Sequence, residues 1–418
     1  MKPKIYFRTD QSLLEHDHLF RQSQVIDSIL TYQKDNDSID EYCYTESNSQ
    51  YILPLAVKYS PADWTDYELD KKSIFEYLST EQISDIQNSR CILLIDQSVE
   101  GYSTSWLWSW FYNKCRNYRI SPRSIIYLSG DQSCHDSHEA WCGSNDIQEK
   151  LVVIPSTSLL IYIRRHYDRY KLKTNFNEIT EYKKNNKIFL YDSLNLRPRS
   201  HRVLNYLHLI NADLSEKGNI SMPSPRDWWK ETTDVQTLLK HGLPKTILDK
   251  VNILGDARKA LYNHDLETIH YHHYAERILT DLYKNSWVSI VTEASFFDYE
   301  STVFISEKTF KPIACMQPFI IVGSKNILKY LRKLGYKTFS PFIDETYDDV
   351  DDPYRFTAIV NAIKKIDEID NKIDWYNSLQ EIVEHNFNLF MTIGKVRSNE
   401  HNIISQHYFD YFKGIENA

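Results

Sequence analysis

Short apolar runs rich in β-branched residues recur along this chain, and each ends at a polar or glycine-containing turn. In the first half these runs are KIYFR (4–8), YILPLAV (51–57), CILLID (91–96) and SIIYLSG (124–130). Helical sequence lies between them, most clearly TSWLWSWFYNKC (104–115). Buried parallel strands have this composition, and strands that alternate with helices favour an open α/β sheet.

The same alternation restarts after a polar segment at 171–187, where we place a domain boundary because apolar runs are almost absent there. Strands are then expected at KIFLYD (187–192), WVSIVTEA (287–294) and PFIIVG (318–323), and helices at HRVLNYLHLI (201–210) and NILKYLRKL (326–334). A chain of 418 residues is too long for one ordinary core. We therefore expect two Rossmann-like domains, 1–180 and 187–418, which face each other across a cleft.

Charge and targeting signals narrow the class of protein. The formal net charge is −8, which argues against a surface that coats DNA but is compatible with a local basic groove. The N-terminus, MKPKIYFRTD, has no apolar signal region, and no apolar run approaches the roughly 20 residues that span a bilayer. The six cysteines lack paired spacing. We expect a soluble, cytoplasmic protein with no membrane span and no disulfide framework.

The stretch FISEKTFKPI (304–313) places an acid and a base where an apolar run ends. Ser306 is a strong N-cap, so a helix is expected to begin there, and the free N–H groups of a helix N-terminus suit a phosphate. Lys308 adds a positive charge, and Glu307 can accept hydrogen bonds from the two vicinal hydroxyls of a ribose. The alternative interpretation is a surface ion pair at the start of a helix.

A second basic cluster lies in SLNLRPRSHR (193–202), between a predicted strand and a predicted helix. Its basic residues are Arg197, Arg199, His201 and Arg202. Arginine suits bidentate contact with phosphate, and ligands of open α/β sheets bind where strands end. We interpret this loop as a phosphate-binding loop; a solvated basic turn would more often contain Lys and Gly.

Four segments in this order resemble the donor-binding half of a group of bacterial and viral GT-B glycosyltransferases: KIFLYDSLNLRPRSHRVLNYL, SIVTEASFF, FISEKTFKPIACMQPFIIVG and LGYKTFSPFIDETYD. The Glu-Lys pair resembles the fucosyltransferase type, in which a Thr/Ser-Glu-Lys segment holds a nucleotide-sugar. The resemblance covers most of 187–352, and LLIDQSVEGYS (93–103) and IIYLSGD (125–131) resemble the group more weakly. True fucosyltransferases differ from this chain over much of its length, so the resemblance specifies neither fucose as the sugar nor GDP as the nucleotide.

The resemblance implies a role for each residue of these motifs. Glu307 would contact the ribose of the donor, and Thr292, Glu293 and Ser306 would lie on the same rim. The diphosphate would be held by Lys308 and by one or more of Arg197, Arg199 and Arg202. The implied co-substrate is a UDP- or GDP-linked sugar.

Sugar transfer requires that the acceptor hydroxyl is deprotonated and that the leaving diphosphate is stabilised. The cations above can perform the second task without a metal. The base is expected from the first domain, where the predicted strand CILLID ends: Glu100 is the first choice and Asp96 the second. Asp131 and His135, after the next strand, come behind them. An acid at the end of a strand is often only a cap, and a retaining reaction needs no such base.

Three other clusters contain residues that bind metals. They are CHDSHEAWC (134–142), the DVD of YDDVDDPYR (347–355), and the histidines His270, His272 and His273. The first lacks CxxC spacing, the second does not end an apolar strand, and neighbouring histidines on a helix point in different directions. We interpret them as a polar loop, a solvated turn and a partly exposed helix, and we expect no metal cofactor.

The sequence thus predicts a metal-independent glycosyltransferase that moves a sugar from a nucleotide-sugar donor to an acceptor hydroxyl. The acceptor class stays open between a glycan and a modified DNA base; the latter would make the protein a phage-type DNA glycosyltransferase acting in the host cytoplasm. A third hypothesis is a non-catalytic binding module of the same fold, because a fold does not determine function.

Overall fold

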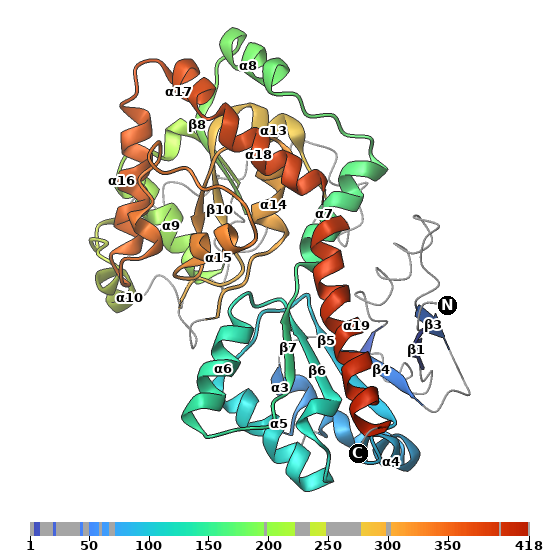
Figure 1. Cartoon of the computed structure of the whole chain (residues 1–418). Helices are drawn as coiled ribbons and strands as arrows, with labels where there is room; N and C mark the ends of the chain where they lie inside the picture. Colours follow the sequence, from blue (N-terminus) through green and yellow to red (C-terminus); the bar gives the residue numbers. More distant parts are fainter. Residues whose placement is uncertain are drawn as a thin grey trace, which may run out of the picture. The chain divides into compact units, whose positions relative to one another are not determined.

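The protein is described by a computed structural model that covers two compact units. The described residues are 4–8, 20–21, 42–44, 50–57, 61–66, 72–195, 199–221, 235–247, 277–297, 302–392 and 394–416. The first unit comprises Met1–Leu159, Tyr299–Thr302 and Ile393–Ala418, and the second comprises Leu160–Asp298 and Val303–Thr392. Each unit contains a sheet of mainly parallel strands covered by helices, so the chain is an α/β protein (Figure 1).

The first unit contains a sheet in the order β3-β1-β4-β5-β6-β7, and β2 pairs antiparallel with β4. The strands are β1 (Ile5–Phe7), β2 (Phe20–Arg21), β3 (Tyr42–Tyr44), β4 (Tyr51–Val57), β5 (Cys91–Gln97), β6 (Ile125–Ser129) and β7 (Val152–Pro155). The four apolar runs of the first half form β1, β4, β5 and β6, which confirms those strand predictions.

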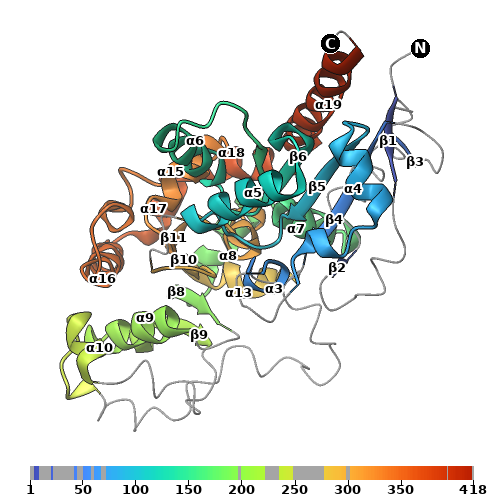
Figure 2. The same ribbon diagram turned by 90° about the horizontal axis from the view of Figure 1, so that it is seen from below.

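Successive side chains of these strands alternate between two apolar cores, one on each face of the sheet. Leu93 and Ile95 face a core that includes Trp108, whereas Ile92 and Leu94 face the other. The first core is covered by α3 (Pro61–Trp64), α4 (Thr80–Gln87), α5 (Ser105–Tyr118) and α6 (Cys134–Ser144). The second is covered by helix α19 (Gly394–Glu416), red in Figures 1 and 2.

The second unit contains a parallel sheet in the order β11-β10-β8-β9. Its strands are β8 (Phe189–Leu194), β9 (Gly218–Ser221), β10 (Ser286–Thr292) and β11 (Phe319–Val322). From β8 the chain first moves to one neighbour, β9, and then returns to the other side of β8 to form β10. The strand order therefore reverses between β8 and β10, and such a reversal is where open α/β sheets bind ligands.

Helices cover both faces of this second sheet (Figure 1). Helices α9 (Ser200–Asn211) and α16 (Arg355–Asp367) contact each other, and α13 (Thr280–Lys284) and α14 (Glu307–Ala314) contact β10. The other helices within the described residues are α7 (Ser158–Arg169), α8 (Phe176–Asn185), α10 (Val235–Lys240), α15 (Ile327–Lys333), α17 (Lys372–Ser378) and α18 (Gln380–Met391). Short 3₁₀ turns cover Ile74–Glu76, Pro122–Ser124, Ser215–Lys217 and Thr346–Asp348.

One local prediction was wrong, and two other segments fold in ways that their composition did not indicate. The segment CHDSHEAWC is helix α6 rather than a loop, because His138 and Cys142, one turn apart, are buried against Tyr112. The polar segment 171–187 contains helix α8, which begins at the N-cap Asn175. Residues 303–305 are buried but form only an isolated bridge at Phe304 rather than a strand of the sheet.

The two units also divide the chain differently from the predicted domains 1–180 and 187–418. The division falls between Leu159 and Leu160, and α19 belongs to the first unit. Ile404 and Tyr408 lie in the core of the first sheet, and the Glu400 carboxylate accepts the Thr157 N–H at 2.9 Å. An amphipathic helix reveals that it has an apolar face but not which sheet that face will cover.

Two further findings concern the described part of the chain. Cys91, Cys115, Cys134, Cys142 and Cys315 are buried free thiols. No described helix is both long and apolar enough to cross a membrane.

Candidate functional site

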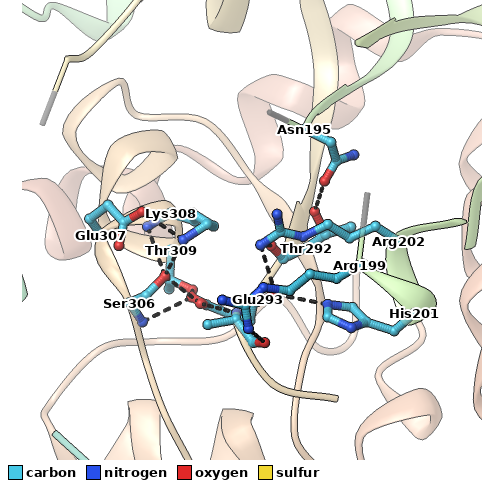
Figure 3. A network of polar contacts seen from close by, with 11 residues as sticks. Asn195, Arg199, His201, Arg202, Thr292, Glu293, Ser306, Glu307, Lys308 and Thr309 are labelled. Atoms are coloured by element: carbon cyan, nitrogen blue, oxygen red, sulfur yellow. Dashed lines mark hydrogen bonds and ion pairs between the residues drawn. The ribbon is translucent and has the colours of Figure 1, made fainter. Parts of the chain in front are cut away.

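The predicted donor-binding residues that the structure describes gather at the carboxyl ends of β8 and β10 (Figure 3). Thr292 ends β10 and Glu293 follows it; Ser306 caps α14, whose first residues are Glu307 and Lys308. Arg199 and Arg202 lie at the start of α9, after β8. Arg197 lies outside the described residues.

Glu293 holds the start of α14 in place. Its side chain is fully buried and accepts hydrogen bonds from the Ser306 N–H at 3.1 Å, the Ser306 hydroxyl at 2.5 Å and the Thr309 hydroxyl at 2.5 Å. The Ala294 N–H donates to the same carboxylate at 3.2 Å. A buried carboxylate needs this many donors to offset its lost hydration. Glu293 is therefore a structural link between β10 and α14, and it is not among the residues that line the pocket described below.

The basic residues of α9 bind main-chain oxygens of the same strand end. Arg199 donates to the Ala294 carbonyl at 2.5 Å, and His201 Nε2 donates to the Glu293 carbonyl at 2.8 Å. Arg202 is buried and donates to the carbonyls of Glu293 at 3.2 Å and Thr292 at 3.4 Å. The basic loop and the Ser-Glu-Lys triplet thus meet through residues 292–294, as Figure 3 shows.

Glu307 and Lys308 form an ion pair at 2.6 Å, and Lys308 Nζ also donates to the Ser306 hydroxyl at 3.1 Å. Their side chains are 14% and 29% exposed. Burial opposes ionisation of Glu307, but the charges of Lys308 and Lys311 outweigh it and hold its pKa below the ordinary value. Glu307 is therefore charged at neutral pH. Both side chains are partly exposed, so a ligand could replace the ion pair that they form with each other.

A pocket opens where the strand order of the second sheet reverses. It is lined by residues of β8, β10, α13 and α14 together with the segment before α13: Asp192, Leu194, Arg277, Leu279, Tyr283, Ser289, Ile290, Val291, Thr292, Lys308 and Lys311. Three of these residues, Arg277, Lys308 and Lys311, are cations. We refer to this hollow as the cationic pocket.

A buried histidine lies beside the cations of this pocket. His166 of α7 accepts the Ile278 N–H on Nε2 at 3.3 Å. Burial, together with the nearby charges of Lys311, Arg169 and Arg277, lowers the pKa of His166 to about 4. Cations held together in this way favour the binding of an anion.

Sequence reasoning missed three residues of the cationic pocket. Lys311 lies three positions after Lys308, so helical spacing alone puts the two on one face. Asp192 ends the predicted strand KIFLYD and carries the signal of a polar residue at a strand end. Arg277 has no such signal, because only the tertiary fold brings it to β10.

The acids predicted as catalytic bases lie in the first unit. Asp96 is buried near the end of β5 and accepts the Ser98 N–H at 3.0 Å. Asp131 is buried and accepts the Ser133 N–H at 2.9 Å and the Ser103 hydroxyl. Glu100 is half-buried in the turn that follows β5. Asp96 and Asp131 thus cap turns at strand ends, and Glu100 keeps the most accessible carboxylate of the three; His135, on α6, is exposed.

Among the described residues, no group of three or more His, Cys, Asp or Glu side chains could hold a metal ion. In α6, His138 Nε2 lies 3.1 Å from the Tyr112 hydroxyl and 3.3 Å from Cys142 Sγ. Burial lowers the pKa of His138 to about 4, so it packs as a neutral residue. In the acidic run, Asp348 is buried and accepts the Leu328 N–H at 3.1 Å. His270, His272 and His273 lie outside the described residues.

The chain matches no protein-family model and no curated protein sequence. The assignment of a function therefore depends on the residues and geometry described above.

Proposed function

We propose that this chain is a GT-B glycosyltransferase that moves a sugar from a UDP- or GDP-linked donor to an acceptor hydroxyl, with no metal required. The observation that carries the proposal is the convergence of Arg277, Lys308 and Lys311 on one pocket where the strand order reverses. The predicted motif order and its resemblance to that group give further support.

In the proposed mechanism the cationic pocket binds the diphosphate of the donor. Lys308 lies in the first turn of α14, where the helix dipole adds to its charge, and Lys311 lies one turn further along the helix. Cations fixed beside the leaving diphosphate stabilise the negative charge that develops as the sugar departs. This is the task that a divalent metal performs in other phosphate-binding sites.

Glu307 is proposed to accept the vicinal hydroxyls of the ribose, as the resemblance implies. Its ion pair with Lys308 orients both side chains before the ligand arrives. When the diphosphate takes over Lys308, the Glu307 carboxylate becomes available to the hydroxyls. The base for the acceptor is proposed to be Glu100 of the first unit, with Asp96 second; the acceptor is a glycan or a modified DNA base.

Isothermal titration calorimetry with UDP and GDP tests the proposal. Lys308→Ala and Glu307→Ala are each expected to weaken binding about 10- to 100-fold, because each removes a hydrogen bond to a charged group worth about 1.5–3 kcal/mol. Lys365→Ala is the matched control, since Lys365 also forms an ion pair, with Asp344 at 2.6 Å, but on the exposed surface of α16. Wild-type protein that binds neither nucleotide, and hydrolyses no sugar nucleotide in a panel, would refute the proposal.

A further inference from the structure

The cationic pocket also contains a buried carboxyl group that the diphosphate does not explain. Asp192 lies on β8, is 2% exposed and lines the pocket together with Arg277, Lys308 and Lys311. A carboxylate repels a phosphate that binds beside it. If the pocket binds an anion, the Asp192 carboxylate therefore needs a hydrogen-bond donor other than that anion.

Two serine hydroxyls and the main-chain N–H of Asp192 itself contact this carboxyl group. The hydroxyls of Ser286 and Ser289 both donate to Oδ2, at 2.5 and 2.7 Å. Asp192 forms no ion pair within the part of the chain that the structure describes. Lys183, whose charge reaches it, instead donates to the carbonyls of Ser286 and Lys284 and to the Gln317 side chain.

The surroundings of Asp192 disfavour the ionised form of its carboxyl group. Burial raises its pKa to about 7, although the two serine hydroxyls and the charge of Lys183 oppose that shift. Tyr283 of α13 and Cys315 after α14 also lie within electrostatic reach of the carboxyl group, and burial raises the pKa of both, so they are neutral at pH 7. A ligand that donates a hydrogen bond to this carboxylate would relieve the cost, and a bare anion would increase it.

We propose that Asp192 accepts a hydrogen bond from a hydroxyl of the transferred sugar, while Arg277, Lys308 and Lys311 hold the adjoining phosphates. The pocket then selects sugar phosphates over anions of equal charge that carry no hydroxyl. This inference rests on the proposed function, because it assigns the second half of the same donor. It makes Asp192 a specificity-determining residue rather than part of the strand framework alone.

Asp192→Asn separates the two ligand classes, because it keeps the size of the side chain and removes its charge. Binding is measured by calorimetry at pH 8, above the raised pKa, with pyrophosphate, UDP, UDP-glucose, GDP and GDP-mannose. The variant is expected to bind pyrophosphate several-fold more tightly. Wild-type protein should bind a nucleotide-sugar more tightly than the matching nucleoside diphosphate, and in the variant this affinity ratio should fall about ten-fold. That change corresponds to the loss of one charge-assisted hydrogen bond.

Asp348→Asn is the matched control. Asp348 is also a buried aspartate of the second unit, but it does not line the cationic pocket, so its loss should lower stability and leave the ligand preference unchanged. Asp192→Ser, also uncharged, serves if Asp192→Asn does not fold. Equal changes for pyrophosphate and nucleotide-sugars, or no change for either, would overturn the role of Asp192 while leaving the donor site intact. Wild-type protein that binds none of the five probes overturns this inference and the proposed function together.

Discussion

At the scale of single residues, the edge of the second sheet shows how buried polar groups fix the geometry of the candidate site. Glu293 collects donors from Ser306 and Thr309, and His201 and Arg202 donate to the main chain of the same strand end. These side chains keep little freedom to contact a ligand. The accessible charged side chains, Glu307 and Lys308, are positioned by the main chain that these buried groups hold in place. Residue type alone does not distinguish the two groups.

Glu293→Gln tests the framework role. The substituted amide N–H₂ would face the donors of Ser306, Thr309 or Ala294, and we expect the free energy of unfolding to fall by about 2–4 kcal/mol. Urea unfolding measures this change. Glu381→Gln is the control: Glu381 is 85% exposed and pairs with Lys337 at 2.5 Å, so its loss should cost no more than about 1 kcal/mol. Equal, small effects of both substitutions would contradict the framework role.

His201 gives a pH dependence with a defined sign. Burial, with the nearby charge of Arg202, lowers its pKa from 6.5 to about 3. The unfolded chain therefore binds a proton below pH 6.5 that the folded chain does not, and the stabilising contribution of neutral His201 is lost as the pH falls from 6.5 towards 3.

The variant His201→Asn isolates this contribution. The difference in unfolding free energy between wild type and variant should be largest at pH 7 and shrink by about 1.4 kcal/mol per pH unit below the histidine pKa. Urea unfolding at pH 7 and pH 5 measures it. A difference that does not change with pH would show that His201 does not resist protonation.

At the scale of elements, capping residues determine where helices begin and end. Tertiary packing determines which residue types fit at a given position in a strand. Ser306 starts α14 as its composition predicts, accepting the Lys308 N–H at 3.3 Å. Gly335 ends α15 with φ of 91°, a conformation that glycine adopts without strain. Strand β9, by contrast, has no strong sequence signal and begins at Gly218, which packs against the ring of Tyr191.

Two glycine-to-alanine substitutions should have opposite effects. A Cβ on Gly218 would lie 2.3 Å from ring carbons of the fully buried Tyr191, so Gly218→Ala should destabilise the fold by about 1–3 kcal/mol. A methyl group added at Gly143, inside α6, would meet no atom within 4 Å, so Gly143→Ala should stabilise the fold by about 0.5–1 kcal/mol. Thermal unfolding compares the two. A stabilising Gly218→Ala would contradict the packing of β8 against β9.

At the scale of the whole molecule, each sheet is completed by segments that are distant in the sequence. The first sheet is built from residues before 160, yet one of its faces is covered by α19, which follows the second unit in the sequence. The second sheet takes its pocket from the segment before α13, from α14 and from β8. Folding of the first unit therefore depends on a helix that the chain supplies only after the second unit.

Adjacent isoleucines of α19 test this dependence. Ile404 is fully buried in the core of the first sheet, whereas Ile403 is 46% exposed. Ile404→Ala should lower the free energy of unfolding by about 2–5 kcal/mol, and Ile403→Ala by less than about 1 kcal/mol. Urea unfolding of both variants measures this. Similar losses for the two would show that α19 does not cover the sheet as described.

Local sequence was enough to predict the fold class, most strands of both sheets and the start of α14, because strand alternation and capping are local properties of the chain. It also indicated that residues 199–202 and 306–308 belong to one edge, since parallel strands end on the same side. The prediction of a loop at 134–142 failed because burial of His138 and Cys142 outweighs their polar composition.

Which charged residues line the cationic pocket, and which hold the framework, depends on the packing of the whole chain. Arg202 and Lys308 look alike as cations beside a predicted strand end, yet one is buried on main-chain carbonyls and the other lines the pocket. Arg277 reaches that pocket, and α19 reaches the first sheet, through contacts that no local pattern encodes. The physical reason is that burial and electrostatic environment depend on the packing of distant segments, whereas secondary structure depends mainly on neighbours in the chain.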